Sequence, residues 1–256
     1  QMGDIYELTL CQEFFAENIS INPVSVFKEM KRISPSPFSC FLKTGHQYLL
    51  SSSPERFLCR RGSKIFSQPI KGTSKRGSNK KEDEMLKQQL FESEKERSEN
   101  VMIVDLVRND LSKIAKRGSV KVDELFGIYS YSTVHQMIST VSCECKEEVS
   151  FADIIKATFP MGSMTGAPKI RALQLIEEYE ETGRGLFSGA VGYIDPDGDF
   201  DFSVVIRSIL YDSSLKYISV QTGGAITINS VAENEYEESV LKSKTMLTAL
   251  NNVTDK

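Results

Sequence analysis

The strand-like segments of this chain come in runs and do not alternate one by one with helices. They are rich in β-branched and aromatic residues and are bounded by Gly, Ser, Pro or Asp. They cover residues 4–10, 38–44, 48–53, 56–62, 63–70, 131–145, 185–196, 201–212 and 216–228. Runs of strands favour an α+β fold, with antiparallel sheets flanked by helices, over a doubly wound parallel sheet.

Helical patterns separate these runs of strands. They cover residues 22–33, about 81–115, 150–159, 167–181 and 233–253. The most polar segment, Thr73 to Asn100, predicts a mobile basic loop that enters a charged helix. Because no linker-like change of composition divides the chain, we expect a single domain over residues 1–256.

Charge and hydropathy exclude several classes of protein. The net charge is -4, from 31 basic and 35 acidic residues, so no general field attracts nucleic acid or an anionic membrane. No apolar run reaches the roughly 20 residues that span a bilayer, and the first residues lack the layout of a signal peptide. We therefore expect a cytoplasmic protein without nucleic-acid or membrane partners. The scattered cysteines predict reduced, packed thiols: Cys11, Cys40, Cys59, Cys143 and Cys145.

Two glutamate pairs have i,i+3 spacing. They are Glu96 with Glu99 and Glu235 with Glu238, and each pair shares one face of a predicted helix. A single pair of this kind is typical of a solvated helix surface. Carboxylates from two helices, together with water and an anionic ligand, would form the oxygen shell that magnesium accepts. The pairs therefore indicate a Mg²⁺ site, with solvated helix faces as the alternative.

Small residues cluster at two further places. Gly162, Ser163, Thr165 and Gly166 precede Pro168, which suits the first turn of a helix. Backbone N–H groups exposed there would bind an anion, with simple helix capping as the alternative. The spacing is not that of a Walker motif, so a nucleotide site is poorly supported. Gly223 and Gly224 lie in a strand pattern, which predicts either close approach of a ligand to the backbone or a bulge.

Lys71 lies between Pro69-Ile70 and Gly72-Thr73, where the sequence predicts a turn. A lysine in a turn is usually solvated, so this position alone indicates no function.

Several motifs resemble those of the chorismate-utilising family, which includes anthranilate, aminodeoxychorismate, isochorismate and salicylate synthases. In family order and over nearly the whole chain they are GDIYELTL, SSSPERFL, QPIKGT, SENVMIVDLVRNDL, FPMGSMTGAPKIRALQLIEE, RGLFSGAVGYI, DFSVVIRSI and GGAITINSVAENEYEESVLKSK. The resemblance implies extended antiparallel sheets packed together, with helices outside and the substrate in a deep cleft.

The resemblance also implies site residues. Glu99 and Glu238 match direct magnesium ligands, whereas Glu96 and Glu235 match carboxylates that act through water. Arg207 and Lys242 match positions that bind a substrate carboxylate, a task that suits a planar guanidinium. Other positions that match substrate contacts are Gly72, Thr73, His135, Ser163, Tyr193, Gly223, Gly224 and Ala225. Several members of the family have glycine where this chain has Ala225, and the resemblance does not fix the role of His135.

The lysine in QPIKGT separates two branches of the family. Aminodeoxychorismate synthases resemble this chain in having lysine, whereas anthranilate synthases typically have alanine. The resemblance implies that the Lys71 amine attacks C2 of chorismate while Glu55, as general acid, protonates the leaving C4 hydroxyl. Ammonia then enters at C4 and expels the lysine. The attacking amine must be neutral, which burial or a nearby positive charge favours, and a carboxyl with a raised pKa suits the acid.

The implied activity is that of component I of aminodeoxychorismate synthase. This enzyme converts chorismate and ammonia to 4-amino-4-deoxychorismate for p-aminobenzoate and folate synthesis. The chain has no amidotransferase triad motif, so a glutamine amidotransferase subunit or free ammonia would supply the nitrogen. The family's usual N-terminal segment is lacking, and we expect either a natural short form or a catalytic portion. The alternatives are anthranilate synthase component I, an isochorismate or salicylate synthase, and an inactive module that binds chorismate or the glutaminase.

Overall fold

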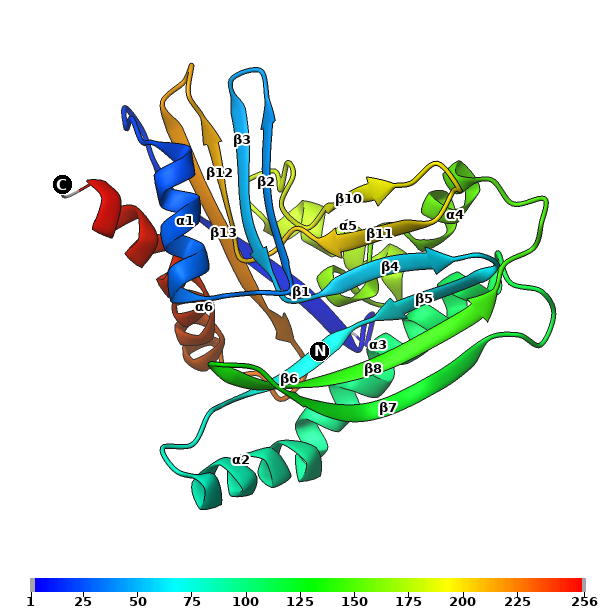
Figure 1. Ribbon diagram of the computed structural model, residues 1–256. Coiled ribbons are helices and arrows are strands. Elements are labelled where there is room, and N and C mark those ends of the chain that lie inside the picture. Colours follow the sequence, from blue (N-terminus) through cyan, green and yellow to red (C-terminus); the bar gives the residue numbers. More distant parts are fainter. Residues whose placement is uncertain (1–2, 255–256) are drawn as a thin grey trace. The chain divides into compact units, whose positions relative to one another are not determined.

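The computed structural model describes residues 3–254, which form two compact units (Figure 1). Unit 1 contains the residues up to Pro54, Ile170–Val191 and the residues from Ser203. Unit 2 contains Glu55–Lys169 and Gly192–Phe202. Both units combine antiparallel strands with helices, which confirms the predicted α+β fold. The expectation of one catalytic domain over residues 1–256 stays a prediction.

Unit 1 is built on an antiparallel sheet with helices beside it. Its strands lie in the order β2 (Phe38–Thr44), β3 (Gln47–Ser53), β12 (Ser208–Asp212), β13 (Tyr217–Ile226) and β1 (Glu7–Ala16). Its helices are α1 (Pro23–Ile33), α5 (Lys169–Tyr179, from residue 170 onward) and α6 (Ala232–Thr254). The connections between β2 and β3 and between β12 and β13 are short, as expected for antiparallel neighbours.

The main core of unit 1 lies between its sheet and two helices. Helices α1 and α6 lie side by side on one face of the sheet (Figure 1). Met30 of α1 and Met246 of α6 are fully buried and pack with Leu50 and Ile209 of the strands. Burial of each such side chain contributes about 1.5–3 kcal/mol to stability, so packing of the two helices stabilises the sheet.

Unit 2 is built around the long strand β8. Its strands lie in the order β10 (Ala190–Ile194), β11 (Phe200–Val204), β4 (Arg56–Arg61), β5 (Lys64–Gln68), β8 (Val134–Glu144) and β6 (Ile70–Lys75), and β7 (Lys121–Ser130) also pairs with β8. Its helices are α2 (Lys80–Glu92), α3 (Glu94–Ser112) and α4 (Phe151–Thr158), followed by a 3₁₀ turn η1 (Gly162–Met164) and the short strand β9 (Gly166–Ala167). The N-terminal half of β8 pairs with β6, and its C-terminal half pairs with β5.

The helix predicted over residues 81–115 is two helices. Ser93 divides them, because its extended backbone (φ -63°, ψ 111°) cannot continue the helical path. Its N–H bonds to Leu90 O at the end of α2, and its side chain accepts from the Glu96 N–H at the start of α3. The prediction of one continuous helix is therefore wrong at this serine.

Three strand predictions also need correction. The expected turn and loop after Pro69 is strand β6, which pairs with β8. Strand β7 is not among the predicted strands, since two register shifts near Glu124 break its alternation. The single strand expected over 201–212 is β11 and β12, interrupted before Ser208 where Arg207 has a φ of 52°.

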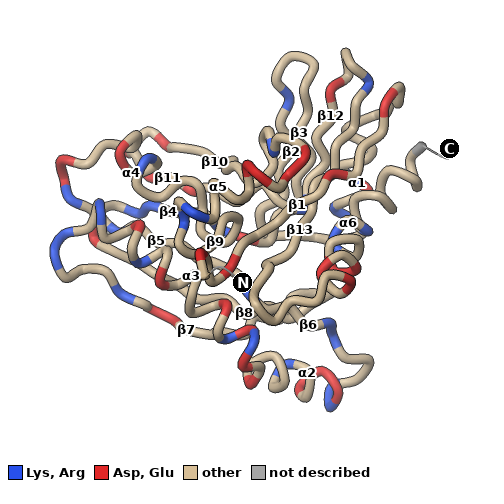
Figure 2. The backbone as a smooth tube through the Cα atoms, turned by 180° about the vertical axis from the view of Figure 1, so that it is seen from behind, with Lys and Arg blue, Asp and Glu red and all other residues tan. Residues whose placement is uncertain are grey.

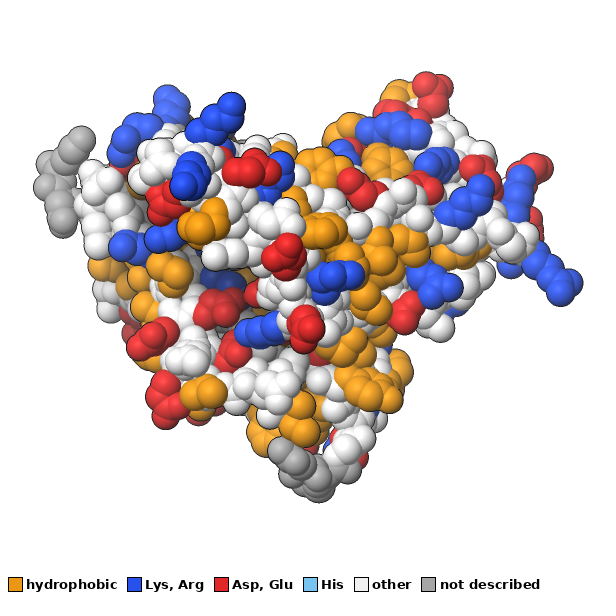
Figure 3. Space-filling view, turned by 90° about the horizontal axis from the view of Figure 1, so that it is seen from below, with side chains coloured by type: hydrophobic (Ala, Val, Ile, Leu, Met, Phe, Trp, Pro, Cys, Tyr) orange, Lys and Arg blue, Asp and Glu red, His pale blue; other side chains and the backbone are white. Residues whose placement is uncertain are grey.

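Charged side chains of both signs are spread over the described surface. Acidic residues mark the first turns of α6 in Figure 2. On the face seen in Figure 3, Lys and Arg side chains are interspersed with Asp and Glu. All five cysteines are free thiols, three of them buried, in agreement with the expected packing role. No helix in the described residues is both long and apolar enough to cross a membrane.

A stability test follows from the contact between β13 and β1. A Cβ added at Gly223 would lie 2.1 Å from Leu10 O and 2.8 Å from Cys11 Cα, so Gly223→Ala forces the two strands apart. We expect this change to lower the free energy of unfolding by roughly 1–3 kcal/mol, measured by urea denaturation. Gly183→Ala is the matched control, because a Cβ there meets nothing within 4 Å. Equal stability of the two variants would contradict the packing described for β13.

Candidate functional site

A bulge in β6 sets the geometry of the site in unit 2. The register of β6 with β8 shifts between Ile70 and Thr73. Gly72, inside the bulge, has a φ of 95°, in the left-handed region that favours glycine. A Cβ at Gly72 would lie 3.1 Å from Glu96 Oε2 and 3.2 Å from Leu90 Cδ1. Glycine therefore allows β6 to lie directly against these two helical residues.

Lys71 is held in this bulge and is not a solvated turn residue. Its side chain is only 12% exposed, and its Nζ lies 4.0 Å from Glu99 Oε2 on α3. The Glu99 side chain is itself only 10% exposed. The structure thus places a lysine amine and a glutamate carboxylate together in partly dry surroundings, which is unusual for both residue types.

Glu55 lies at the start of β4 and is buried. Burial raises the pKa of its carboxyl to about 7, although the Ser163 hydroxyl, the Lys71 charge and the Ile70 backbone oppose this rise. A carboxyl with this pKa keeps its proton close to neutral pH, as a general acid must. The role of Glu55 as that acid stays a prediction.

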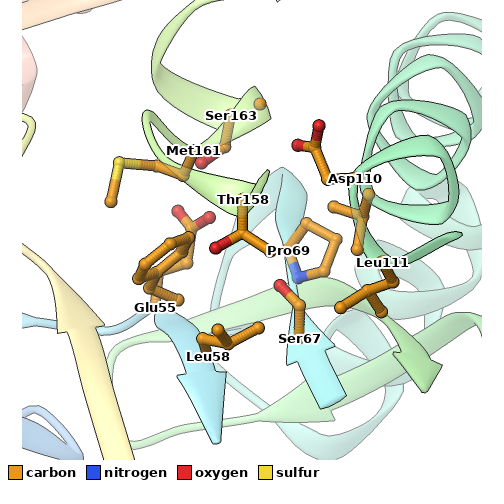
Figure 4. Close-up of a pocket in the computed structure, with 12 residues that line it drawn as sticks. Glu55, Leu58, Ser67, Pro69, Asp110, Leu111, Thr158, Met161 and Ser163 are labelled. Atoms are coloured by element: carbon orange, nitrogen blue, oxygen red, sulfur yellow. The ribbon is translucent and has the colours of Figure 1, made fainter. Parts of the chain in front are cut away.

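A cavity in unit 2 adjoins Glu55 (Figure 4). The Glu55 carboxyl and the Ser163 side chain point toward each other, and Asp110 and Leu111 lie opposite them on α3. Ser67 and Thr158 add hydroxyl groups to the lining. The cavity therefore combines apolar walls with a few polar groups close to the buried acid, as is usual in small-molecule sites.

The segment expected to bind an anion at a helix N-terminus is folded differently. Residues 161–166 are buried, and the N–H groups of Met164 and Thr165 donate to Met161 O and Gly162 O at 3.2 and 3.1 Å. The 3₁₀ turn η1 uses these donors before α5 begins. The prediction of exposed N–H groups is therefore wrong for these two donors, whereas Ser163 does lie at the cavity.

The remaining predicted residues of unit 2 lie in different surroundings. His135 is fully buried, with Nδ1 2.8 Å from Ser130 Oγ and Nε2 3.0 Å from Asp83 Oδ1. Its ring thus joins the end of β7 and the start of α2 to β8. Thr73 and Tyr193 are exposed, Tyr193 by 58%. A role in substrate contact stays a prediction for all three.

Unit 1 holds a compact group of charged residues. Arg207 donates from Nη1 to Lys242 O at 3.1 Å, and burial lowers the pKa of its guanidinium while Glu238 opposes this shift. Lys242 Nζ donates to Gly223 O at 2.8 Å and lies 2.7 Å from Glu238 Oε1. Two cations with one carboxylate as their neighbour offer a binding place for an anionic group.

The glycines of β13 serve close packing and do not form a bulge. Residues Leu8 to Ala16 pair with β13 without a register shift, and Gly223 is opposite Cys11. A Cβ at Gly224 would lie 3.0 Å from Glu235 Oε2, so this glycine makes room for the glutamate. Ala225 follows in the same ladder, opposite Thr9.

The glutamate pairs lie on helices, as predicted, and both pairs are close to the N-terminal end of their helix. Glu96 and Glu99 lie on α3, and Glu235 and Glu238 lie on α6 (Figure 2). In residues 3–254 no group of three or more His, Cys, Asp or Glu side chains is assembled that could hold a metal ion. Glu96 with Glu99 in unit 2, and Glu235 with Glu238 in unit 1, are pairs of hard oxygen donors, the ligand type that Mg²⁺ prefers. A bound magnesium ion stays a prediction.

Sequence reasoning missed a buried ion pair near the cavity. Lys169 Nζ bonds to Asp110 Oδ2, and the side chains are 14% and 7% exposed. Both residues lie within the quoted motifs VRNDL and GAPKIRA. Nothing in their spacing indicates that positions 59 residues apart would meet.

Comparison with known proteins gives consistent results. The pattern of the chorismate binding enzyme family matches residues 1–248. An aminodeoxychorismate synthase of Streptomyces griseus is 43% identical over 251 residues, which cover 97% of this chain and 34% of the relative. Anthranilate synthase component 1 of Aquifex aeolicus is 40% identical, with 97% and 50% covered. Aminodeoxychorismate synthase component 1 of Bacillus subtilis is 38% identical, with 97% and 52% covered.

The solved structures agree with the sequence relatives. Anthranilate synthase component I from Streptococcus pneumoniae TIGR4 aligns with a TM-score of 0.86 and 33% identity, over 95% of this chain and 53% of that chain. This confirms the predicted anthranilate-synthase-like fold. The chain spans from about a third to about half of the length of these relatives. On the family match and these identities, the chain belongs to the chorismate binding enzyme family.

Proposed function

We propose that this chain is component I of an aminodeoxychorismate synthase, which converts chorismate and ammonia to 4-amino-4-deoxychorismate. Overall identity does not separate this activity from anthranilate synthesis, because relatives with both names match at about 40%. The observation that carries the proposal is Lys71, held beside Glu99 and facing Glu55 in unit 2. A branch that aminates without a covalent lysine has no use for an amine at this position.

In the first step the neutral Lys71 amine forms a bond to C2 of chorismate. Both conjugated ring double bonds shift and the C4–O bond breaks, while Glu55 transfers its proton so that water leaves. The Lys71 side chain is 12% exposed, and its Nζ lies 4.0 Å from Glu99 Oε2. The buried Glu55 keeps its proton near neutral pH, which a poor leaving group such as hydroxide requires.

In the second step ammonia forms a bond to C4, and the C2–N bond to Lys71 breaks. Both double bonds return to their first positions and the lysine amine is restored. The Glu55 carboxylate left by the first step takes up the proton that the entering ammonia releases. Glu55 is thereby protonated again for the next cycle.

The charged residues of unit 1 suit recognition of the substrate's carboxylates. Arg207 and Lys242 supply the cations for this task. Glu99 and Glu238 are the proposed direct ligands of Mg²⁺, with Glu96 and Glu235 acting through water. When bound, magnesium would neutralise a substrate carboxylate.

Ammonia is proposed to come from a glutamine amidotransferase subunit. Relatives named component 1 support this division of labour, since that name implies a second component. Free ammonium salts should replace the partner in an assay of this chain.

The product assay tests the proposal directly. Chorismate, Mg²⁺ and ammonium chloride are incubated with the chain, and mass spectrometry identifies the product. We expect aminodeoxychorismate, and we expect Lys71→Ala to reduce its formation by at least about 100-fold because the covalent step is lost. Lys75→Ala, an exposed lysine on the same strand, is the control. Anthranilate as the product, or undiminished C4 amination by folded Lys71→Ala, would contradict the proposal.

The pH dependence tests Glu55. Its pKa of about 7 lies above its ordinary value of 4.5, so the folded chain holds a proton in this window that the unfolded chain releases. The free energy of unfolding therefore falls as the pH rises from about 4.5 to 7, by roughly 1–3 kcal/mol from this group. Glu55→Gln should abolish that slope in urea denaturation and also abolish amination. An identical slope in both proteins would show that Glu55 is not the buried acid described.

Removal of magnesium tests the glutamate pairs. Excess chelator should lower turnover by at least about 10-fold, and added Mg²⁺ should restore it. Glu99→Gln should raise the Mg²⁺ concentration needed for half-maximal activity, because it removes a hard anionic donor. Glu94→Gln, which changes an exposed carboxylate in the first turn of the same helix, is the control. Full activity in excess chelator would contradict the proposed magnesium site.

A further inference from the structure

A buried ion pair joins α3 to the first residue of α5. Asp110 is 5% exposed, and the Lys169 side chain beside it is 14% exposed. Lys169 Nζ also donates to Pro160 O at 2.7 Å and reaches Thr158 O at 3.4 Å. Burying two charges costs solvation free energy, which is offset only where further hydrogen bonds complete the pair. Lys169 makes such bonds to Thr158, the last residue of α4, and to Pro160, which follows the helix.

The residues that Lys169 holds continue directly into the turn that carries Ser163. This turn, Met161–Thr165, also packs on α3, since a Cβ at Gly162 would lie 3.2 Å from Leu106 Cβ. Thr165 Oγ1 donates to Met161 O at 3.1 Å and closes the turn on itself. The turn is therefore fixed from within and at both sides, which leaves its serine little freedom.

We propose that the Asp110–Lys169 pair is a positioning device for the general acid. It holds the turn Met161–Thr165 so that the Ser163 hydroxyl stays directed at the Glu55 carboxyl (Figure 4). The inference rests on the proposed function, in which Glu55 protonates the leaving hydroxyl. Lys169 acts through Ser163 and is not itself catalytic.

The charges around Glu55 allow a matched control. Lys71 faces Glu55 from β6, and Asp110 lines the same cavity from α3. Lys113 Nζ binds the same Asp110 carboxylate at 3.0 Å but extends to Ala157 O, at 3.3 Å, instead of Pro160 O. Lys113→Met therefore removes the same charge from the same carboxylate as Lys169→Met does, without releasing the turn.

The first measurement is a titration of Glu55 without substrate, by NMR of ¹³C-labelled glutamate carboxyls. Because Ser163 opposes the rise in the pKa of Glu55, freeing Ser163 should raise that pKa above its value of about 7. We expect similar upward shifts in Ser163→Ala and Lys169→Met and no shift in Lys113→Met. An unshifted pKa in folded Lys169→Met, or an equal shift in Lys113→Met, would overturn the inference.

The second measurement is a double-mutant cycle on the consumption of chorismate. Lys169→Met should lower kcat by roughly 10- to 100-fold with KM nearly unchanged, since orientation of the acid is lost and substrate binding is kept. Added to Ser163→Ala, the same substitution should cause no further loss, because both act through one contact. Fully additive losses would show that Lys169 acts elsewhere.

These outcomes are separable from failure of the proposed function. A different product would refute the proposed activity, whereas the titration of Glu55 uses neither substrate nor product. If Lys169→Met does not fold, as judged by circular dichroism, both measurements are repeated in concentrated sucrose, which favours the folded state. The same two results are then expected and the same two would overturn the inference.

Discussion

The close approach of β6 to the helices of unit 2 is the contact on which the proposed chemistry depends. Gly72 makes it possible, because a side chain at that position would collide with Glu96 and Leu90. The bulge formed there places Lys71 4.0 Å from Glu99 Oε2 and lets its charge reach Glu55. An amine, a buried acid and a carboxylate are thus held together by one backbone irregularity, in keeping with the frequent occurrence of bulges at active sites.

Glu55 and Glu99 lie in different surroundings within unit 2. Loss of water raises the pKa of Glu55 to about 7, so its carboxyl holds a proton close to neutral pH. Glu99 lies between two lysines, with Lys71 Nζ at 4.0 Å and Lys95 Nζ at 3.9 Å from its carboxylate oxygens. Under the proposed function the two carboxyls take opposite roles, because their surroundings differ. This division follows from packing and not from residue type.

Unit 1 handles charge in another way. Its cations Arg207 and Lys242 are tied to main-chain oxygens, which fixes where their positive charge lies. Glycines 223 and 224 leave space for the neighbouring strand and for Glu235. Under the proposed function, unit 1 would receive anionic groups, whereas unit 2 would supply the nucleophile and the proton donor.

The sequence by itself determined the α+β class, the family motifs and the helical faces of the glutamate pairs, because these follow from local periodicity and from residues close together in the chain. It also placed Lys71, Glu55 and Ser163 as candidates through their motifs. Only the tertiary structure decided that residues 70–75 form a strand, that Ser93 divides a helix and that the 3₁₀ turn occupies the N–H groups of Met164 and Thr165. Each depends on pairing or capping that residue type alone does not specify. The Asp110–Lys169 contact joins positions 59 residues apart, and a raised pKa at Glu55 needs burial by several elements, so neither is encoded locally.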